Sequence, residues 1–159
     1  MPGLLRPLAP QDGRQSDTAL FVARGTRRML RRLNFSTITE LPLLSGRRAD
    51  IVALAMDGTI FIVEIKSSIE DFRADIKWRD YRTHCDRLFF AIPETVPSEI
   101  MPEDAGLILA DAFGAEILRQ APEHRIAAAT RRAMLVRFAQ AAAHRLHRLS
   151  DPEVLAGGG

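Results

Sequence analysis

Two carboxylates and one lysine have the residue types and the spacing of a site that does chemistry. Glu64 and Lys66 stand two residues apart in an apolar, β-branched segment, and Asp50 lies fourteen residues before Glu64 in another such segment. Residues i and i+2 of a β-strand point to the same face, so Glu64 and Lys66 are predicted to lie side by side. Because a turn at Asp57-Gly58 separates the two segments, they predict a β-hairpin.

The register of this hairpin decides whether Asp50 meets Glu64. With a two-residue turn, Asp50 would lie opposite Ile65 and on the wrong face. With a three-residue turn in which Gly58 is left-handed, Asp50 would lie opposite Glu64. The second register would gather Asp50, Glu64 and Lys66 at one end of the hairpin. It predicts a positive φ at Gly58 and both carboxylates on the same side.

Two carboxylates that face each other across a hairpin attract a cation. Their Cβ atoms would be about 5 Å apart, and the repulsion between them is costly unless a positive ion lies between them. Mg²⁺ typically takes one or two carboxylates together with waters and phosphate oxygens. Such an ion activates a water and stabilises charge on a phosphate, while Lys66 would place the nucleophile, as phosphodiester hydrolysis requires. The alternative is a surface ion pair between Glu64 and Lys66, with Asp50 merely starting a strand.

Lysine is rare in this sequence. Of 22 basic residues, only Lys66 and Lys77 are lysines, and the others are arginines. A coding bias toward arginine would explain the excess. Lysine offers a compact point charge that fits beside a phosphate and a metal, whereas arginine keeps a wide planar fork. The contrast makes Lys66 the first catalytic candidate.

The elements that must position these residues follow the order helix, three strands, helix, strand, and then additions. Residues 17–33 predict an amphipathic helix with a basic outer face. Its arginines are Arg24, Arg27, Arg28, Arg31 and Arg32. Predicted strands cover residues 35–44, 48–56, 59–66, 86–93, 105–111 and 115–120. Two further helices are predicted over residues 67–84 and 126–149.

Length and composition fit one globular domain. The chain has 159 residues, of which 47% are hydrophobic and 26% charged, and no apolar run reaches the roughly 20 residues of a membrane span. We expect a cytoplasmic, nucleoid-associated protein with no membrane contact. Residues 1–15 are expected to form a disordered arm, residues 16–150 a single domain and residues 151–159 a flexible tail. The single cysteine, Cys85, excludes an internal disulfide.

The net charge of +2 conceals an uneven distribution. Residues 49–118 are acidic, whereas both ends of the chain are basic. An acidic cation site flanked by phosphate-attracting surfaces would have this layout, and so would an ordinary solvated surface. The arginines of the first helix favour contact with a polyanion. Arg24, Arg28 and Arg31 are the predicted DNA-binding residues of that helix.

Together these residues resemble the PD-(D/E)XK nuclease superfamily. Ala49-Asp50 stands at its Pro-Asp motif, and Glu64-Ile65-Lys66 stands at its acid-x-Lys motif. More narrowly, the segment GRRADIVALAMDGTIFIVEIKSSIEDFRADIKWRDYRTHCDRLFFAIP looks like the MmcB family of bacterial DNA-repair proteins. The resemblance implies an α/β fold with a restriction-endonuclease-like core and extra C-terminal strands and helix.

The resemblance, which extends over about residues 17–149, also implies roles for the site residues. It implies Asp50 and Glu64 as ligands of Mg²⁺ or Mn²⁺, with the Ile65 carbonyl as a further ligand. It implies Lys66 as the catalytic lysine.

The sequence departs from the pattern of the superfamily in two places. Ala49 replaces the proline, and the first helix lacks the acid that many such nucleases carry there, since Asp17 stands at its very start. Glu40 on the first strand could substitute as an outer metal ligand. The alternative is that Glu40 is an exposed strand carboxylate.

Members of the superfamily often send a polar side chain from the second helix into the site. The candidates here are Asp71, Asp75, Lys77, Trp78, Tyr81 and Arg82. We expect Lys77 to take this role and to contact nucleic acid. Trp78 and Tyr81 could stack on bases, or they could pack in the core.

The sequence therefore predicts a Mg²⁺-dependent DNA endonuclease, or a related phosphodiesterase, that acts in DNA repair. One alternative is a DNA-binding module with the same fold and a weak or silent site. Another is an interaction subunit whose C-terminal helix packs on a repair-protein partner or on its own copy in a homodimer. The apolar stripe on that helix consists of Leu135, Phe138, Leu146 and Leu149.

Overall fold

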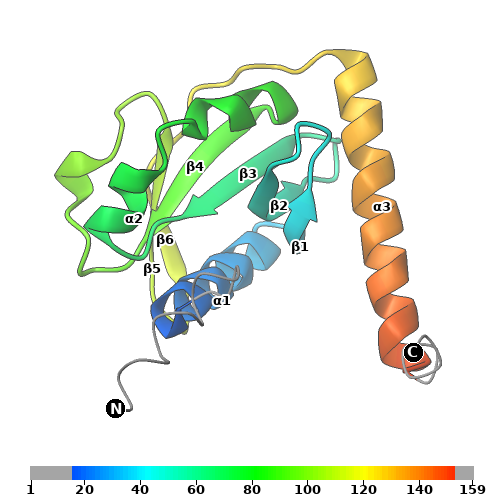
Figure 1. Ribbon diagram of the computed structural model, residues 1–159, viewed down its shortest axis with the longest axis horizontal. Coiled ribbons are helices and arrows are strands. Elements are labelled where there is room, and N and C mark those ends of the chain that lie inside the picture. The colour runs from blue at the N-terminus through cyan, green and yellow to red at the C-terminus, as the bar shows by residue number, and fades with distance from the viewer. Residues whose placement is uncertain (1–15, 153–159) are drawn as a thin grey trace, which may run out of the picture.

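A mixed six-stranded sheet in the order β1-β2-β3-β4-β5-β6 forms the centre of the molecule (Figure 1). The computed structural model describes residues 16–152, so the predicted arm 1–15 and residues 153–159 of the predicted tail lie outside the described residues. The elements are α1 (Asp17–Arg32), β1 (Ser36–Pro42), β2 (Arg48–Leu54), β3 (Ile60–Ile65), α2 (Ile69–Ala74), η3 (Trp78–His84), β4 (Arg87–Ile92), η4 (Ser98–Ile100), β5 (Gly106–Ala110), β6 (Ala115–Arg119) and α3 (Ala128–Ser150). Strand β4 pairs in parallel with β3 and β5, and all other pairs are antiparallel. The predicted α/β fold is confirmed.

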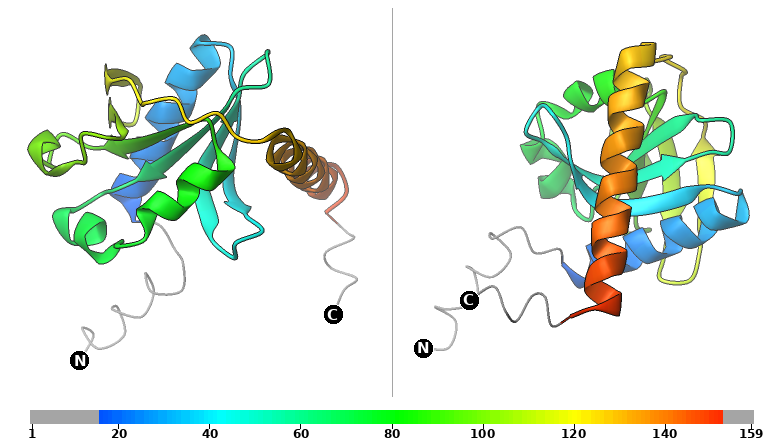
Figure 2. Two further views of the ribbon diagram at one scale, coloured as in Figure 1. Left: turned by 90° about the horizontal axis from the view of Figure 1, so that it is seen from above. Right: turned by 90° about the vertical axis from the view of Figure 1, so that its right-hand side faces the viewer.

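Helices cover both faces of the sheet, because its central strands are apolar on both sides. On one face, Val63 of β3 packs in a cluster with Leu30 of α1. On the other face, Ile62 belongs to a cluster that includes Trp78 of η3 and residues of α3. The two views of Figure 2 show α1 and α3 on different sides of the sheet. Since strand residues alternate between faces, Glu64 points to the same side as Ile62.

The helix α1 lies very close to the turn between β5 and β6. Its start is capped by Ser16, whose Oγ accepts a hydrogen bond from the Ala19 N–H at 3.1 Å. A Cβ atom on Gly25 would collide with the carbonyl oxygens of Asp111 and Gly114. Only glycine permits this approach. The packing places one face of α1 against the sheet and leaves its arginines exposed.

The second predicted helix is broken in two, which corrects the expectation of one helix over residues 67–84. The structure has the short helix α2 and, after a gap, the 3-10 helix η3. At the break, Asp75 has a non-helical ψ of 82°, and its carboxylate binds Lys66 at 2.8 Å. Ile76, the residue after Asp75, is 82% exposed.

The aromatic residues of η3 belong to the core. Trp78 and Tyr81 are three residues apart, a spacing that aligns side chains in a 3-10 helix, and each is 5% exposed. The ring of Trp78 meets that of Phe90 edge-on, with centroids 5.1 Å apart. Of the two alternatives for Trp78 and Tyr81, core packing is confirmed.

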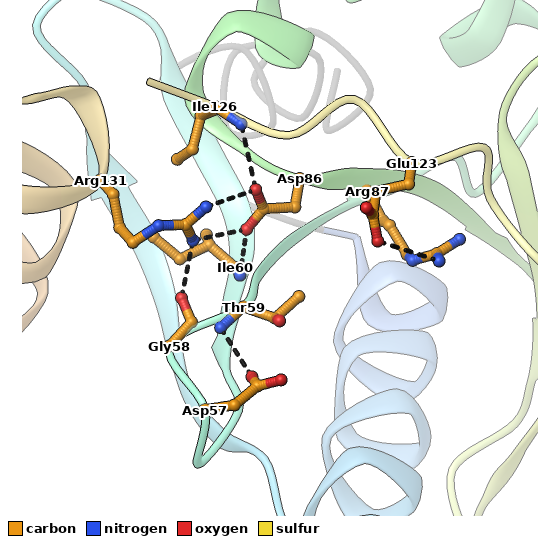
Figure 3. Close-up of polar contacts among 9 residues, drawn as sticks. All are labelled: Asp57, Gly58, Thr59, Ile60, Asp86, Arg87, Glu123, Ile126 and Arg131. Atoms are coloured by element: carbon orange, nitrogen blue, oxygen red, sulfur yellow. Dashed lines mark hydrogen bonds and ion pairs between the residues drawn. The ribbon is translucent and has the colours of Figure 1, made fainter. Parts of the chain in front are cut away.

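Asp86 joins the start of β3 to β4 and α3 (Figure 3). Its buried carboxylate accepts hydrogen bonds from the N–H groups of Ile60 at 2.8 Å and Ile126 at 3.1 Å. It also binds the Arg131 guanidinium through contacts of 2.7 and 2.8 Å. Burial by itself would raise the pKa of Asp86, but these hydrogen bonds outweigh burial and lower the pKa to about 2. The sequence patterns gave no sign of this cluster, because Asp86 and Arg131 lie 45 residues apart.

The helix α3 stands beside the β1 edge of the sheet (Figure 1). Arg145 donates hydrogen bonds to backbone carbonyls of β1. The predicted apolar stripe divides, because Leu135 and Phe138 pack against the core, whereas Leu146 and Leu149 are 66% and 81% exposed. Among the helices of residues 16–152, none has the length and apolar character to span a membrane.

Candidate functional site

The hairpin of β2 and β3 has the register that brings Asp50 to Glu64. The outermost pair of its ladder is Ile51 with Val63. One step further, Asp50 and Glu64 lie opposite each other on the η3 side of the sheet. The turn is the three-residue type, with Gly58 at a φ of 91°. The predicted register is therefore confirmed, and the two-residue turn is excluded.

Asp50 and Glu64 tie the two strands together where the ladder ends. The Asp50 N–H donates to Glu64 Oε2 at 2.9 Å, and the Ile65 N–H donates to Asp50 Oδ2 at 2.8 Å. Each carboxylate uses one oxygen in these bonds. Both residues line the same cavity, so a ligand bound there would lie beside the two carboxylates.

The negative charges of Asp50 and Glu64 are poorly compensated. Burial raises the pKa of Asp50 to about 6. Burial, and next the negative charge of Asp50, raise the pKa of Glu64 well above its usual value. Desolvation and like-charge repulsion both disfavour the ionised forms, so the pair resists carrying two charges at once. A bound cation would oppose this effect by stabilising both carboxylates.

Lys66 is held by an acid from the break between α2 and η3. Its Nζ lies 2.8 Å from Asp75 Oδ2, and the two side chains are 7% and 17% exposed. Asp75 Oδ1 is also 3.9 Å from Arg47, whose guanidinium lies 5.4 Å from the centre of the Tyr81 ring. The break between α2 and η3 thus places the carboxylate of Asp75 at the site. Lys77 is exposed and does not line the cavity, because the break at Asp75 redirects the chain.

The site is a cavity of about 560 Å³ beside the start of α1. Its acidic and basic lining includes Glu40, Asp50, Glu64, Lys66, Asp71 and Asp75. Arg47 and Arg48 also line it. The cavity therefore combines a carboxylate pair, an ammonium group and guanidinium groups, which suits an anionic substrate that approaches a metal ion.

Glu40 reaches this cavity from β1. Its backbone is left-handed, with a φ of 51°, a conformation uncommon for a residue other than glycine. Its carboxylate lies 3.8 Å from Arg48. After burial and other groups, the charge of Glu40 contributes to the raised pKa of Asp50. The structure thus brings Glu40 near the carboxylate pair, and its role as an outer ligand stays a prediction.

The oxygen donors fit a hard cation that keeps part of its water shell. Asp50 and Glu64 offer two carboxylates, and Ile65 lines the same cavity. Within residues 16–152, no group of three or more His, Cys, Asp or Glu residues is placed to hold a metal ion. Two carboxylates suffice for Mg²⁺, which completes its coordination with waters and substrate phosphates, but they do not form an all-protein cage.

A second hollow, the basic groove, has a volume of about 650 Å³ and lies between α1 and β1. Four arginines line it: Arg24, Arg27, Arg28 and Arg31. The structure therefore brings the three predicted DNA-binding arginines of α1 to one groove. Lys77 lines neither this groove nor the cavity.

Comparisons with known proteins identify a family and two structural likenesses. Residues 6–153 match the family model described as DNA repair protein MmcB-like. No curated protein matches the sequence. A protein of unknown function from Silicibacter pomeroyi is 42% identical, with a TM-score of 0.83 over 88% of this chain and 96% of that chain. A repair endonuclease from Pyrococcus abyssi is 17% identical, with a TM-score of 0.41 over 63% of this chain and 48% of that chain, a likeness too distant to support an argument.

Proposed function

The chain belongs to the MmcB-like family of DNA repair proteins, and we propose that it is a metal-dependent nuclease that hydrolyses DNA phosphodiester bonds during repair. The observation that carries this proposal is the pair Asp50 and Glu64, which share one cavity with Lys66 and have raised pKa values. Strongly perturbed groups gathered in a cavity are typical of functional sites. A cation between the two carboxylates would relieve a repulsion that the protein leaves in place.

Each residue has its own task in the proposed reaction. Asp50 and Glu64 hold Mg²⁺ or Mn²⁺, with the Ile65 carbonyl as a further ligand. Glu40 serves as an outer ligand. The bound ion supplies a Lewis acid that lowers the pKa of a water molecule and stabilises negative charge on the phosphate. Lys66 places the attacking water with its compact ammonium group, next to the phosphate.

A second candidate is a catalytically silent DNA-binding module with the same fold. It is favoured by the ion pair between Lys66 and Asp75 at 2.8 Å, which already engages the ammonium group. It is also favoured by the hydrogen bonds that occupy one oxygen each of Asp50 and Glu64. In such a protein the basic groove, and not the cavity, would carry the function.

Cleavage assays with Mg²⁺ and Mn²⁺ separate the two candidates. We expect the wild-type chain to cut DNA, and Asp50→Asn and Glu64→Gln to lose cleavage while they stay folded. Glu103→Gln is the matched control, because Glu103 is exposed and lies outside the cavity. Mn²⁺ binding measured by calorimetry should fall in the two site variants and not in the control. DNA and Mn²⁺ binding by the wild type without any cleavage would refute the nuclease and favour the silent module.

DNA binding by α1 is the second measurable part of the proposal. Changing Arg24, Arg28 and Arg31 to Gln should weaken binding to all DNA sequences. It should also flatten the dependence of log K on log salt by about one unit per lost contact. A matched control removes the same charge at three exposed arginines outside the groove: Arg125, Arg132 and Arg148. If the α1 variant left the slope of log K against log salt unchanged, the arginines of α1 would be part of an ordinary solvated surface that does not bind DNA.

A further inference from the structure

The basic groove and the carboxylate cavity are neighbours along α1. Ser16 and Ala19, at the start of α1, line the cavity, and from Leu20 onward the helix lines the groove. On the other side, Glu40 of β1 lines both hollows. The basic groove and the carboxylate cavity share Glu40, and we call the two hollows together the trough. The two elements α1 and β1, which contact each other, can be followed in Figure 2.

The groove part of the trough combines cations with apolar surface. Its cations are the four arginines of α1 that line it. Its apolar lining consists of Leu20, Ala23 and Phe35, of which Leu20 is 51% exposed. Phe35 is half-buried, and its ring rests on that of Phe61, with centroids 4.6 Å apart. This combination fits a ligand that is anionic along one side and apolar along the other.

Single-stranded DNA has such a pattern, and duplex DNA does not. In a single strand the phosphates follow one side, and the faces of the bases are free to stack on aromatic and apolar side chains. In a duplex the base faces are stacked inside, so only phosphates, sugars and base edges reach a protein. The surface formed by Leu20 and Phe35 would therefore find no partner on an intact duplex.

We propose that the trough binds single-stranded DNA, with the phosphates on the arginines of α1 and the bases against Leu20 and Phe35. The strand continues past Glu40 to the carboxylate cavity. Arg27 fixes the arrangement, because its Nε donates to Thr37 Oγ1 at 3.0 Å and so ties α1 to β1. Only the delivery of the strand to the carboxylates rests on the proposed nuclease function. The substrate class is a single-stranded end, flap or gap.

Fluorescence anisotropy in EDTA tests this binding in the absence of cleavage. The probes are a labelled oligothymidylate and a labelled duplex of the same length. The full chain should bind the single strand at least about tenfold more tightly than the duplex at one salt concentration, because only the single strand offers base faces. The double variant with Leu20→Ala and Phe35→Leu should weaken single-strand binding by about tenfold and leave duplex binding unchanged. Leu146→Ala on α3, at a position that is 66% exposed, should change neither affinity.

The controls separate this proposal from a folding defect and from the nuclease proposal. Thermal unfolding reports whether the double variant is folded, and Leu20→Ala alone, at an exposed position, gives the same comparison if Phe35→Leu unfolds the chain. Equal affinity for the two probes, or equal losses on both, would overturn single-strand binding. Tight single-strand binding without cleavage in Mg²⁺ would support single-strand binding by the trough and refute the proposed nuclease activity. If the chain bound and cut intact duplex in preference to the single strand, the proposed nuclease activity would be supported and single-strand binding by the trough would be refuted.

Discussion

Buried carboxylates lie at both ends of strand β3, in two clusters that are compensated in opposite ways. At its start, Asp86 accepts hydrogen bonds from two backbone N–H groups and from Arg131, and its pKa is lowered to about 2 (Figure 3). At its end, Asp50 and Glu64 face each other, and burial raises both pKa values. The lysine at that end is engaged by another carboxylate.

The charge of Asp86 stabilises the structure, whereas the charges of Asp50 and Glu64 remain available to a cation. A buried carboxylate with a full set of donors joins segments, and Asp86 joins β3, β4 and α3 in this way. The charges of Asp50 and Glu64 are disfavoured by desolvation, and the nearby Lys66, which is paired with Asp75, compensates them only in part. Proteins keep such arrangements at functional sites, which is why the carboxylate pair and not Asp86 is the candidate site.

The largest expected effect is a loss of stability at the compensated cluster. Arg131→Met leaves Asp86 buried without its cation, and breaking a buried ion pair from one side costs about 3 to 5 kcal/mol. Urea unfolding measures this loss, with Arg132→Met as the control, because Arg132 is the exposed neighbour in the same helix. Equal stability of the two variants would show that the Asp86 cluster does not hold the fold.

The next effect concerns activity at the other cluster. Lys66→Ala should lower the rate of cleavage by about 100-fold or more, as expected when a group that stabilises charge is removed, and should leave the chain folded. Lys66→Arg should also be damaging, since the planar guanidinium is larger than the ammonium group that it replaces. Single-turnover cleavage and thermal unfolding measure the two properties. Full turnover by Lys66→Ala would refute the catalytic role of this lysine.

Removing one charge from each cluster should move stability in opposite directions. Asp86→Asn replaces one of its two acceptor oxygens by a donor and loses its ion pair, and should lower the free energy of unfolding by about 2 kcal/mol. Glu64→Gln removes a disfavoured charge and keeps an oxygen that can accept the Asp50 N–H, so stability should be unchanged or rise by up to about 1 kcal/mol. Urea unfolding at neutral pH measures both. Similar losses in the two variants would break the contrast between the clusters.

The two clusters should also show an opposite dependence of stability on pH. Because the pKa of Asp50 is raised from its usual value to about 6, its contribution to stability is present below about pH 4 and declines as pH rises toward 6. The pKa of Asp86 is lowered to about 2, so its contribution is present above about pH 4 and is lost as pH falls toward 2.

Unfolding curves over this pH range assign each contribution to its residue. Asp50→Asn should reduce the decline in stability between about pH 4 and 6, to which Glu64 also contributes through its own raised pKa, and Asp86→Asn should remove part of the loss at acid pH. If the wild-type and Asp50→Asn curves ran parallel between pH 4 and 6, the carboxylate pair would be compensated like Asp86.

The sequence by itself determined the parts of the candidate site that depend on short-range rules. The turn at Gly58 and the two-residue period of strands limited Asp50 to two registers, of which the three-residue turn places it opposite Glu64. The period of a helix was enough to gather the arginines of α1, including Arg24 and Arg31, on one exposed side. Each of these features involves neighbours within one helix or one hairpin, so local geometry specifies it.

The tertiary structure decided how the charges are partnered. Asp75 and not Lys77 lines the cavity, and the charge of Asp75, opposite to that of Lys66, was the signal that could have selected it. Asp86 and Arg131 form an ion pair although they lie 45 residues apart in the sequence. No helical or strand periodicity predicts this cluster. Such contacts form only when separate elements pack against the sheet, and they are set by the three-dimensional path of the chain. The sequence therefore determined which groups lie on which face of the hairpin and of α1, and packing decided which of them are paired with an opposite charge and which line the cavity.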